Sequence, residues 1–412
     1  MAQKSNKKNI IKGKKKESKF LDLKNIDKDT EAAIYYGFQP IEIPEIEKED
    51  HTNSKTLKDG EPLLTIGSND KIENTAEEKS ALLRHYFNSN LAIMPQPVMI
   101  TYNGFINEGK EKNPGKHRKI SLEIIGSPKS ITEAILIKTA LEILQDNGYK
   151  NLYIEINSLG DRESCSKFVR ELTAYFRKHI NIMQAHCRQE FKKDPLFVLN
   201  CQNEKCTLLK EDAPKAIGCL SDESRTHFKE VLEYLESLDI PYKINDCLIS
   251  DRRFASGTVF EIKQKSENPR LADESLATGF RADQACKKLG FKKDVPMIGA
   301  KLYFKTESEK RQLPRIKKTS VFFIQLGDEA KHKSLKVIDI LRQENIFINH
   351  SLGRDKMAGQ MATAERLKVP YILIMGKREA MDETIMIRDT ATRAQETIKI
   401  SELADHLNKL VK

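Results

Sequence analysis

The sequence predicts mixed α and β structure, with a large N-terminal part and a smaller C-terminal α/β module. In the N-terminal part, apolar runs of strand length flank one long helical stretch. Residues 160–242 are charged and helical in pattern. After residue 320, short apolar runs alternate with helical stretches, which is typical of a parallel-type sheet. A chain of 412 residues has room for two or three domains with cores.

The first 20 residues form a separate basic segment. They hold eight lysines against one acid, Glu17, and so supply +7 of the net charge of +10. The segment has too few apolar residues to bury itself, so we predict a disordered tail. It would serve as an electrostatic arm for RNA phosphates, or as a solubilising extension without a specific partner.

The composition argues against membrane insertion and export. No run of about 18 apolar residues occurs, and the N-terminus lacks the apolar stretch of a secretory signal. The seven cysteines are irregularly spaced. We therefore expect a cytoplasmic protein with reduced thiols.

The N-terminal part begins with a helix that ends at Gly37, followed by an extended segment to Pro44. We predict strands at Val98–Tyr102 and Ile120–Ile125, where apolar and polar residues alternate in the second. A capping box at Ser130–Glu133 would then open the next helix.

That helix runs to about Asp146, and Gly148 ends it. Leu152–Ile156 is a short apolar strand. Residues 160–242 would form a helical insertion, in which one apolar stripe indicates a helix packed by one face: Phe228, Val231, Leu232, Leu235 and Leu238.

The C-terminal module follows a charged link at Glu307–Lys318. Its predicted elements, in chain order, are the strand Val321–Leu326, a helix over about 329–344, the strand Ile346–Leu352, a helix over about 356–368, and the strand Tyr371–Gly376.

Four cysteines of the insertion are candidate metal ligands: Cys187, Cys201, Cys206 and Cys219. The spacing of Cys201 and Cys206 fits one half of a zinc site. The alternative is ordinary buried thiols, and we therefore expect no metal.

Three segments resemble histidyl-tRNA synthetases, a family of class II aminoacyl-tRNA synthetases. The first is Ile156–Gly160, INSLG. The second is Asp194–Cys206, DPLFVLNCQNEKC, with Asp212-Ala213-Pro214 behind it. The third is Leu352-Gly353-Arg354 followed by Val369–Gly376, VPYILIMG.

The resemblance implies an α+β fold. A class II core with an antiparallel sheet would span residues 21–312 and include the insertion at about 160–242. An anticodon-binding-like α/β domain would span 316–412. Pro44 lies where the class II dimer motif places its proline, which implies a homodimer.

The residues expected to bind ATP are changed. The motif-two arginine position is Ile106, although Glu108 matches the family. The motif-three arginine region holds Tyr303 and Thr306. Isoleucine and threonine lack the guanidinium that binds phosphate with two parallel bonds. Arg118, in the segment that follows motif two, is a possible substitute.

The histidine-recognition region, Asp251–Glu261 with Gly279–Asp283, is changed as well. The position of its arginine is Ser250, and the possible substitutes are Arg252 and Arg253. Remnants of the histidine and ATP site would be Glu78, Ser80, Glu108, Glu123 and Arg281, with Glu123 matching the carboxylate that binds the imidazole. The structural alternative makes Glu123 and Arg281 a buried pair that supports the sheet.

In the C-terminal module, four polar residues at a strand-to-helix turn are candidates for binding tRNA: Arg354, Asp355, Lys356 and Gln360. A solvated helix start is the alternative.

Our leading hypothesis is a histidyl-tRNA synthetase-like protein that binds tRNA or another structured RNA as a homodimer and has lost ligase chemistry. It would need no cofactor. One alternative is an active, divergent histidine–tRNA ligase that uses ATP and Mg²⁺. A less favoured alternative is a regulatory subunit of histidine biosynthesis, a family that lacks the anticodon-binding domain.

Overall fold

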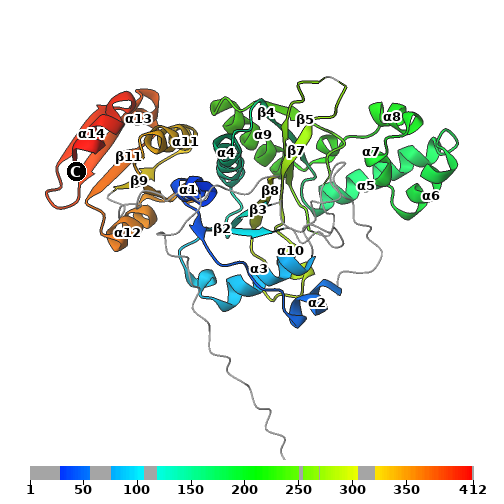
Figure 1. Cartoon of the computed structure of the whole chain (residues 1–412), viewed down its shortest axis with the longest axis horizontal. Coiled ribbons are helices and arrows are strands. Elements are labelled where there is room, and N and C mark those ends of the chain that lie inside the picture. The colour runs from blue at the N-terminus through cyan, green and yellow to red at the C-terminus, as the bar shows by residue number, and fades with distance from the viewer. Residues whose placement is uncertain are drawn as a thin grey trace, which may run out of the picture.

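The computed structural model describes residues 28–55, 76–105, 118–249, 254–268, 270–304 and 321–410. These residues form two sheets (Figure 1). The larger sheet lies in the middle of the molecule, the C-terminal sheet lies at one end, and a group of short helices lies at the other. No helix within these ranges is long and apolar enough to span a membrane.

The larger sheet has eight strands in the order β1-β2-β3-β8-β7-β6-β4-β5. Every pairing from β2 across to β4 is antiparallel, and only the edge strands β1 and β5 pair in parallel. The strands are β1 (Gln39–Pro40), β2 (Val98–Phe105), β3 (Arg118–Ile125), β4 (Leu152–Ser158), β5 (Tyr242–Ile244), β6 (Thr258–Gln264), β7 (Glu274–Arg281) and β8 (Met297–Phe304). The antiparallel core expected from the resemblance is therefore present.

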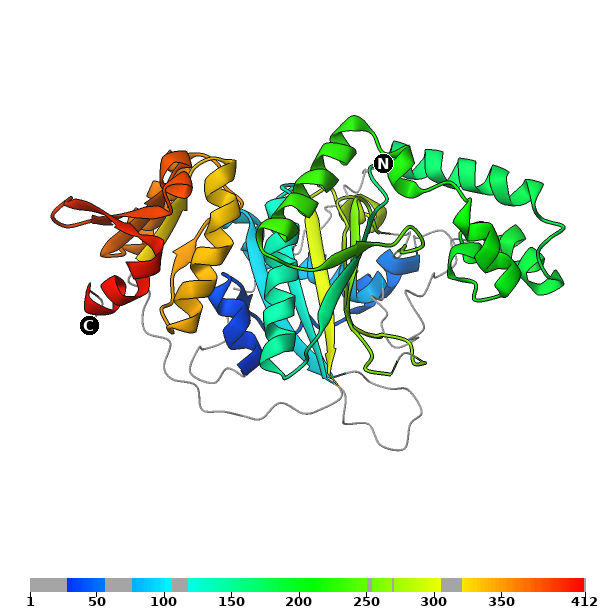
Figure 2. The same ribbon diagram turned by 90° about the horizontal axis from the view of Figure 1, so that it is seen from above.

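One face of this sheet is apolar and covered by helices. In β3, Ile120, Leu122 and Ile124 point to this face and belong to the main hydrophobic core. The helix α4 (Ile131–Asp146) lies against it, and α9 (Asp222–Ser237) packs on α4 (Figures 1 and 2).

The start of α4 differs from the prediction. The helix begins where expected, but the backbone of Ser130 is already helical and its side chain makes no cap hydrogen bond. The Ser130 hydroxyl instead donates to Glu230 at 2.6 Å. The predicted capping box is therefore wrong, because Glu133 is bonded to residues of other elements, described below.

Four other helices of the N-terminal part lie around the larger sheet. They are α1 (Lys28–Tyr35), α2 (Lys48–Lys55), α3 (Ala76–Asn88) and α10 (Ala285–Lys288). Gly37, just after α1, has φ +92°, which lets the chain turn into β1 as the sequence predicted.

The region 160–242 is helical, as predicted, but divides into two parts. Its last helix, α9, belongs to the main core through Phe228, Val231 and Leu235. The earlier helices stand away from the sheet (Figure 2). They are α5 (Arg162–Lys178), α6 (Ala185–Lys193), α7 (Phe197–Asn200) and α8 (Glu204–Glu211).

The C-terminal sheet has the order β10-β9-β11-β12-β13, parallel on one side and antiparallel on the other. Its strands are β9 (Val321–Gln325), β10 (Asn349–His350), β11 (Tyr371–Met375), β12 (Thr384–Asp389) and β13 (Gln395–Lys399). Its helices are α11 (Asp328–Gln343), α12 (Met357–Leu367), α13 (Lys377–Met381) and α14 (Leu403–Leu410). The predicted strands and helices up to residue 376 are confirmed except for the strand Ile346–Leu352, of which only Asn349–His350 pairs in the sheet.

The C-terminal sheet and its helices are docked on the larger part through α11. Arg342 forms ion pairs with Glu142 and Asp146 of α4. Asp339 pairs with Lys138 at 2.6 Å and accepts a hydrogen bond from Tyr36. These contacts join residues of α1 and α4 to the C-terminal part.

Candidate functional site

The face of the larger sheet opposite α4 holds a cluster of charged side chains. Because side chains alternate along a strand, Lys119 and Glu123 of β3 point away from α4. In the β3–β8 register, Ser121 pairs with Lys301, so Lys301 points to the same face. The helix α3 places Glu78 and Lys79 against them. We call these five residues the lysine–glutamate cluster.

The cluster is joined by short ion pairs. The Lys79 ammonium lies 3.2 Å from a Glu123 carboxylate oxygen, and both side chains are only 2% exposed. Lys119 lies 2.8 Å from Glu78, and Lys301 contacts the second oxygen of Glu78. Among the described residues, three ammonium groups thus share two carboxylates.

Burial and the neighbouring charges change how the cluster titrates. Burial, with Lys119 and Lys79 nearby, lowers the pKa of Lys301 to about 8 despite its contact with Glu78. Burial raises the pKa of Glu123, although Lys79 opposes the shift. Burial alone would raise the pKa of Glu78, but Lys301 and Lys119 hold it below its usual value.

The cluster's carboxylates are already neutralised by the protein's own cations. A charge removed from water is tolerated only when it is paired, so Lys79 and Glu123 depend on each other. A cationic or imidazole group that approached Glu123 would have to displace Lys79 from it.

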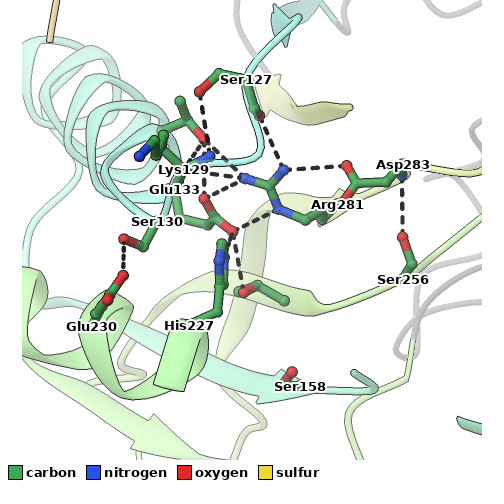
Figure 3. A network of polar contacts seen from close by, with 12 residues as sticks. Ser127, Lys129, Ser130, Glu133, Ser158, His227, Glu230, Ser256, Arg281 and Asp283 are labelled. Atoms are coloured by element: carbon green, nitrogen blue, oxygen red, sulfur yellow. Dashed lines mark hydrogen bonds and ion pairs between the residues drawn. The ribbon is translucent and has the colours of Figure 1, made fainter. Parts of the chain in front are cut away.

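A second buried network lies on the α4 face of the sheet, around Arg281 at the end of β7 (Figure 3). The Arg281 guanidinium binds Glu133 of α4 with two parallel hydrogen bonds, at 2.8 and 2.6 Å. It also donates to the Ser127 carbonyl and the Thr132 hydroxyl. This bidentate geometry is the strongest form of an arginine–carboxylate contact.

Glu133 has a second partner, His227 of α9, whose Nε2 lies 2.6 Å from the carboxylate. Burial would raise the pKa of Glu133, but Arg281 and His227 outweigh it and lower that pKa to about 2. Glu133 therefore stays ionised at all ordinary pH values. The network joins α4, α9 and β7 to one another, which indicates a role in holding the fold together.

Two sequence interpretations are corrected by these contacts. Glu123 and Arg281 are both buried, but they are not a pair: Glu123 contacts Lys79 on one face and Arg281 contacts Glu133 on the other. Arg118 does not join the candidate site either. It points to the α4 face, pairs with Asp29 at 2.6 Å and lies over the Phe304 ring.

The predicted remnants Glu78 and Glu123 come together in the cluster, but Ser80 does not. Its hydroxyl donates to Asp50 of α2 at 2.9 Å. Asp50 is also bound by Arg84, so Ser80 belongs to the α2–α3 contact. The other predicted residues lie outside the described ranges: Ile106, Glu108, Ser250, Arg252, Arg253 and Thr306.

Sequence reasoning missed the roles of Lys79 and Lys301. Lys301 had a detectable signal, because it is the single charged residue in the otherwise apolar strand Met297–Phe304. Lys79 had none, since it follows Glu77 and Glu78 at the start of a helix where charged residues are ordinary.

The predicted tRNA-binding residues of the C-terminal part are mostly engaged within the protein. Gln360 is fully buried, and its side-chain amide donates to the Gln325 carbonyl at 2.8 Å. Arg354 donates to the Gln96 carbonyl at 2.8 Å, and Asp355 pairs with Lys129 at 2.7 Å. Of the four candidates, only Lys356 is exposed without a described contact to another side chain.

Three of the four candidate cysteine ligands lie together in the insertion. The sulfur atoms of Cys187, Cys201 and Cys206 all lie within 4.8 Å of one another, and the three residues are buried. Burial and the neighbouring sulfurs raise the pKa of the Cys206 thiol to about 12. Cys219 lies apart, with its thiol 3.4 Å from Glu171.

Comparison with known proteins shows which proteins this chain is similar to in sequence. Residues 320–410 match the family model described as the anticodon binding domain. The histidine–tRNA ligase of Bacillus subtilis is 29% identical over 335 residues, which cover 79% of this chain and 78% of the relative. The histidine–tRNA ligase of Natranaerobius thermophilus is 26% identical over 393 residues, covering 91% and 92%.

The fold shows the same relation. The crystal structure of apo S. aureus histidyl-tRNA synthetase matches with a TM-score of 0.50 and 23% identity, covering 92% of this chain and 93% of that one. An antiparallel core, a helical insertion and a C-terminal anticodon-binding domain thus occur in the expected order. Over most of its length the chain is therefore similar to histidyl-tRNA synthetases, which are class II aminoacyl-tRNA synthetases, and its residues 320–410 form an anticodon-binding domain.

Proposed function

We propose that this protein binds tRNA or another structured RNA and has lost the chemistry of histidine ligation. The anticodon-binding domain at residues 320–410 supports the RNA half of the proposal. The basic segment at residues 1–20 would add electrostatic attraction to phosphates.

The lysine–glutamate cluster is the observation that supports loss of ligation. The family resemblance assigns Glu123 to the imidazole of histidine, and in this chain its carboxylate is bound by Lys79. The internal ammonium takes the place of the substrate's ring. Both arginine positions expected at ATP, Ile106 and Thr306, are uncharged. Loss of one such group costs roughly 3–4 kcal/mol of transition-state stabilisation.

ATP–pyrophosphate exchange driven by histidine tests this half. We expect no exchange above background from the purified full-length protein, beside the Bacillus subtilis ligase as the positive control. Exchange at a rate comparable to that control would defeat the proposal.

Gel-shift titration with tRNA at two salt concentrations tests the RNA half. Binding should weaken as salt rises, because each lysine or arginine on a phosphate releases a counterion. The exposed Lys356 offers a variant, Lys356→Glu, which should weaken binding further. Lys265→Glu, an exposed lysine at the end of β6, is the matched charge control. A missing or salt-independent shift contradicts RNA binding.

An active, divergent ligase is the second candidate. It is favoured by relatives named histidine–tRNA ligase, whose similarity extends over most of both chains. This candidate requires ATP, Mg²⁺ and a substitute arginine from Arg252 or Arg253. If exchange is observed, Arg253→Ala should abolish it, and an unaffected variant would exclude Arg253 from that role.

A regulatory subunit of histidine biosynthesis is less favoured, because that family lacks the anticodon-binding domain and this chain matches its model. Affinity purification from lysate distinguishes RNA binding from a role as a regulatory subunit. RNA should co-purify under our proposal, and a stoichiometric protein partner without RNA would support the regulatory subunit.

The proposal includes a cytoplasmic homodimer and the domain limits 21–312 and 316–412. Pro44 is half-buried and is flanked by Ile43 and Ile46, whose side chains are 50% and 45% exposed in the single chain. Exposed apolar residues of this kind are often covered by a partner subunit. Light scattering should give twice the chain mass of 47.2 kDa, and a monomer would contradict this part.

A further inference from the structure

Three short helices of the insertion converge on one group of thiols. Cys187 lies on α6, Cys201 directly follows α7, and Cys206 lies in the first turn of α8. The chain turns between α7 and α8, where Asn203 caps α8 by accepting from the Lys205 backbone at 3.1 Å. This turn returns Cys206 to the side of Cys201.

The spacing of the sulfur atoms fits shared coordination of one ion. All three lie within 4.8 Å, and the Cys187 and Cys201 sulfurs are 3.6 Å apart. Zinc–sulfur bonds of about 2.3 Å in a tetrahedron place the sulfurs roughly 3.8 Å apart. A disulfide would bring two sulfurs to about 2.05 Å. The observed separation is therefore too long for a disulfide and close to a tetrahedral edge.

The surroundings also favour a bound cation. The three helices have nine, four and eight residues, lengths at which isolated helices are unstable. A link between them would compensate for that. The Lys210 ammonium donates to the Leu199 and Cys201 carbonyls, which already ties α8 to the end of α7.

We propose that Cys187, Cys201 and Cys206 bind one zinc ion that links α6, α7 and α8. Each thiol gives up its proton on binding, and water fills the fourth position. Cys219 is not a ligand, because it lies apart from the group and contacts Glu171. Thiolate ligands select soft ions such as Zn²⁺ or Cu⁺ over Mg²⁺ or Ca²⁺. The site is independent of ligation and of RNA binding.

Metal content of the untagged, full-length protein tests the site. Purified under reducing conditions and dialysed against zinc-free buffer, the wild type should hold one zinc per chain by mass spectrometry of the elements. Cys206→Ser should lose it. Cys219→Ser, a buried thiol of the same insertion, should keep it. Equal zinc content in Cys206→Ser and the wild type would overturn the proposal, as would copper in place of zinc.

Cobalt spectroscopy on the wild type keeps the test valid if Cys206→Ser folds poorly. After removal of zinc, added Co²⁺ should give a thiolate-to-cobalt charge-transfer band and the intense visible bands of a tetrahedral site. Zinc should displace both. A cobalt spectrum without sulfur ligation, or a Cys187–Cys201 disulfide found by peptide mapping, would overturn the assignment.

Discussion

The two faces of the larger sheet bury charge in different ways. On the α4 face, in the arginine–glutamate network of Figure 3, the Arg281 guanidinium binds Glu133 with two parallel hydrogen bonds and also pairs with Asp283. On the opposite face, three lysines share two glutamates in the lysine–glutamate cluster.

The difference separates an arginine–carboxylate pair that joins several elements from a cluster in which lysines share carboxylates. A bidentate, fully satisfied pair holds elements together, and removal of one partner is costly. In the lysine–glutamate cluster, burial and the neighbouring lysines disfavour the charged form of Lys301 and so lower its pKa. Removing Arg281 should therefore destabilise the protein, whereas removing Lys301 should stabilise it.

The largest effect should come from Arg281→Met. It leaves Glu133 buried with only His227 as a charged partner, and breaking a buried pair in this way costs roughly 3–5 kcal/mol. Urea unfolding monitored by circular dichroism measures the loss. Arg170→Met, an exposed arginine of α5, is the control and should change stability by less than about 0.5 kcal/mol. Equal effects of the two variants would contradict the structural role.

Lowering the pH should weaken the same network without a mutation, because it protonates Glu133. The pKa of Glu133 is about 2 in the folded protein and about 4.5 when unfolded, so its contribution is complete above pH 4.5 and is lost as pH falls toward 2. At about 1.4 kcal/mol per pKa unit, the loss is roughly 3 kcal/mol. Unfolding midpoints measured across this window should fall more steeply in the wild type than in Glu133→Gln.

On the opposite face, Lys301→Met should stabilise the protein. It removes a buried charge that the folded protein disfavours, as the lowered pKa of Lys301 indicates, while Glu78 keeps Lys119, and we expect a gain of roughly 1–3 kcal/mol. Lys263→Met is the matched control and should destabilise, because Lys263 pairs with both Glu155 and Glu261.

The gain from Lys301→Met should depend on pH. The folded pKa of Lys301 is about 8 and the unfolded value is 10.5. Between these values the unfolded chain binds a proton that the folded protein does not, so wild-type stability rises with pH. The advantage of the variant is therefore full below pH 8 and shrinks above it. A constant advantage would show that Lys301 carries no such penalty.

The smallest effect should come from Lys119→Met. The Lys119 and Glu78 side chains are 15% and 30% exposed, so water screens their contact, and Glu78 retains Lys301. We expect a change below about 1 kcal/mol in urea unfolding. A loss as large as that of Arg281→Met would place Lys119 among the residues that hold the fold together.

Local patterns predicted much of the fold. The strand Tyr371–Met375 and the helix Met357–Leu367 appear within two residues of their predicted limits, because their apolar periodicity is local information. The hairpin of β12 and β13 was missed, since β13 is almost entirely exposed and shows no apolar alternation. The family resemblance supplied the antiparallel order of the core, which no local pattern contains.

The candidate site was harder to predict, because its contacts connect distant positions. Lys301 and Glu78 are 223 residues apart. The sequence singled out Glu78 and Glu123, which lie in one cluster, but it could not show that lysines of the same chain would bind them. It also paired Glu123 with Arg281, because the side of the sheet to which each points depends on strand register.

The contact between Lys79 and Glu123 also restricts the evolutionary paths open to this protein. Replacing Lys79 alone would leave the buried Glu123 carboxylate without its partner. This would cost roughly 3–5 kcal/mol of stability, whereas the whole free energy of unfolding is typically about 5–15 kcal/mol. Replacing Glu123 alone would strand the ammonium instead. Under the proposed loss of ligation, descendants could regain an amino-acid site at Glu123 only through paired substitutions, because either single change leaves a buried charge without its partner.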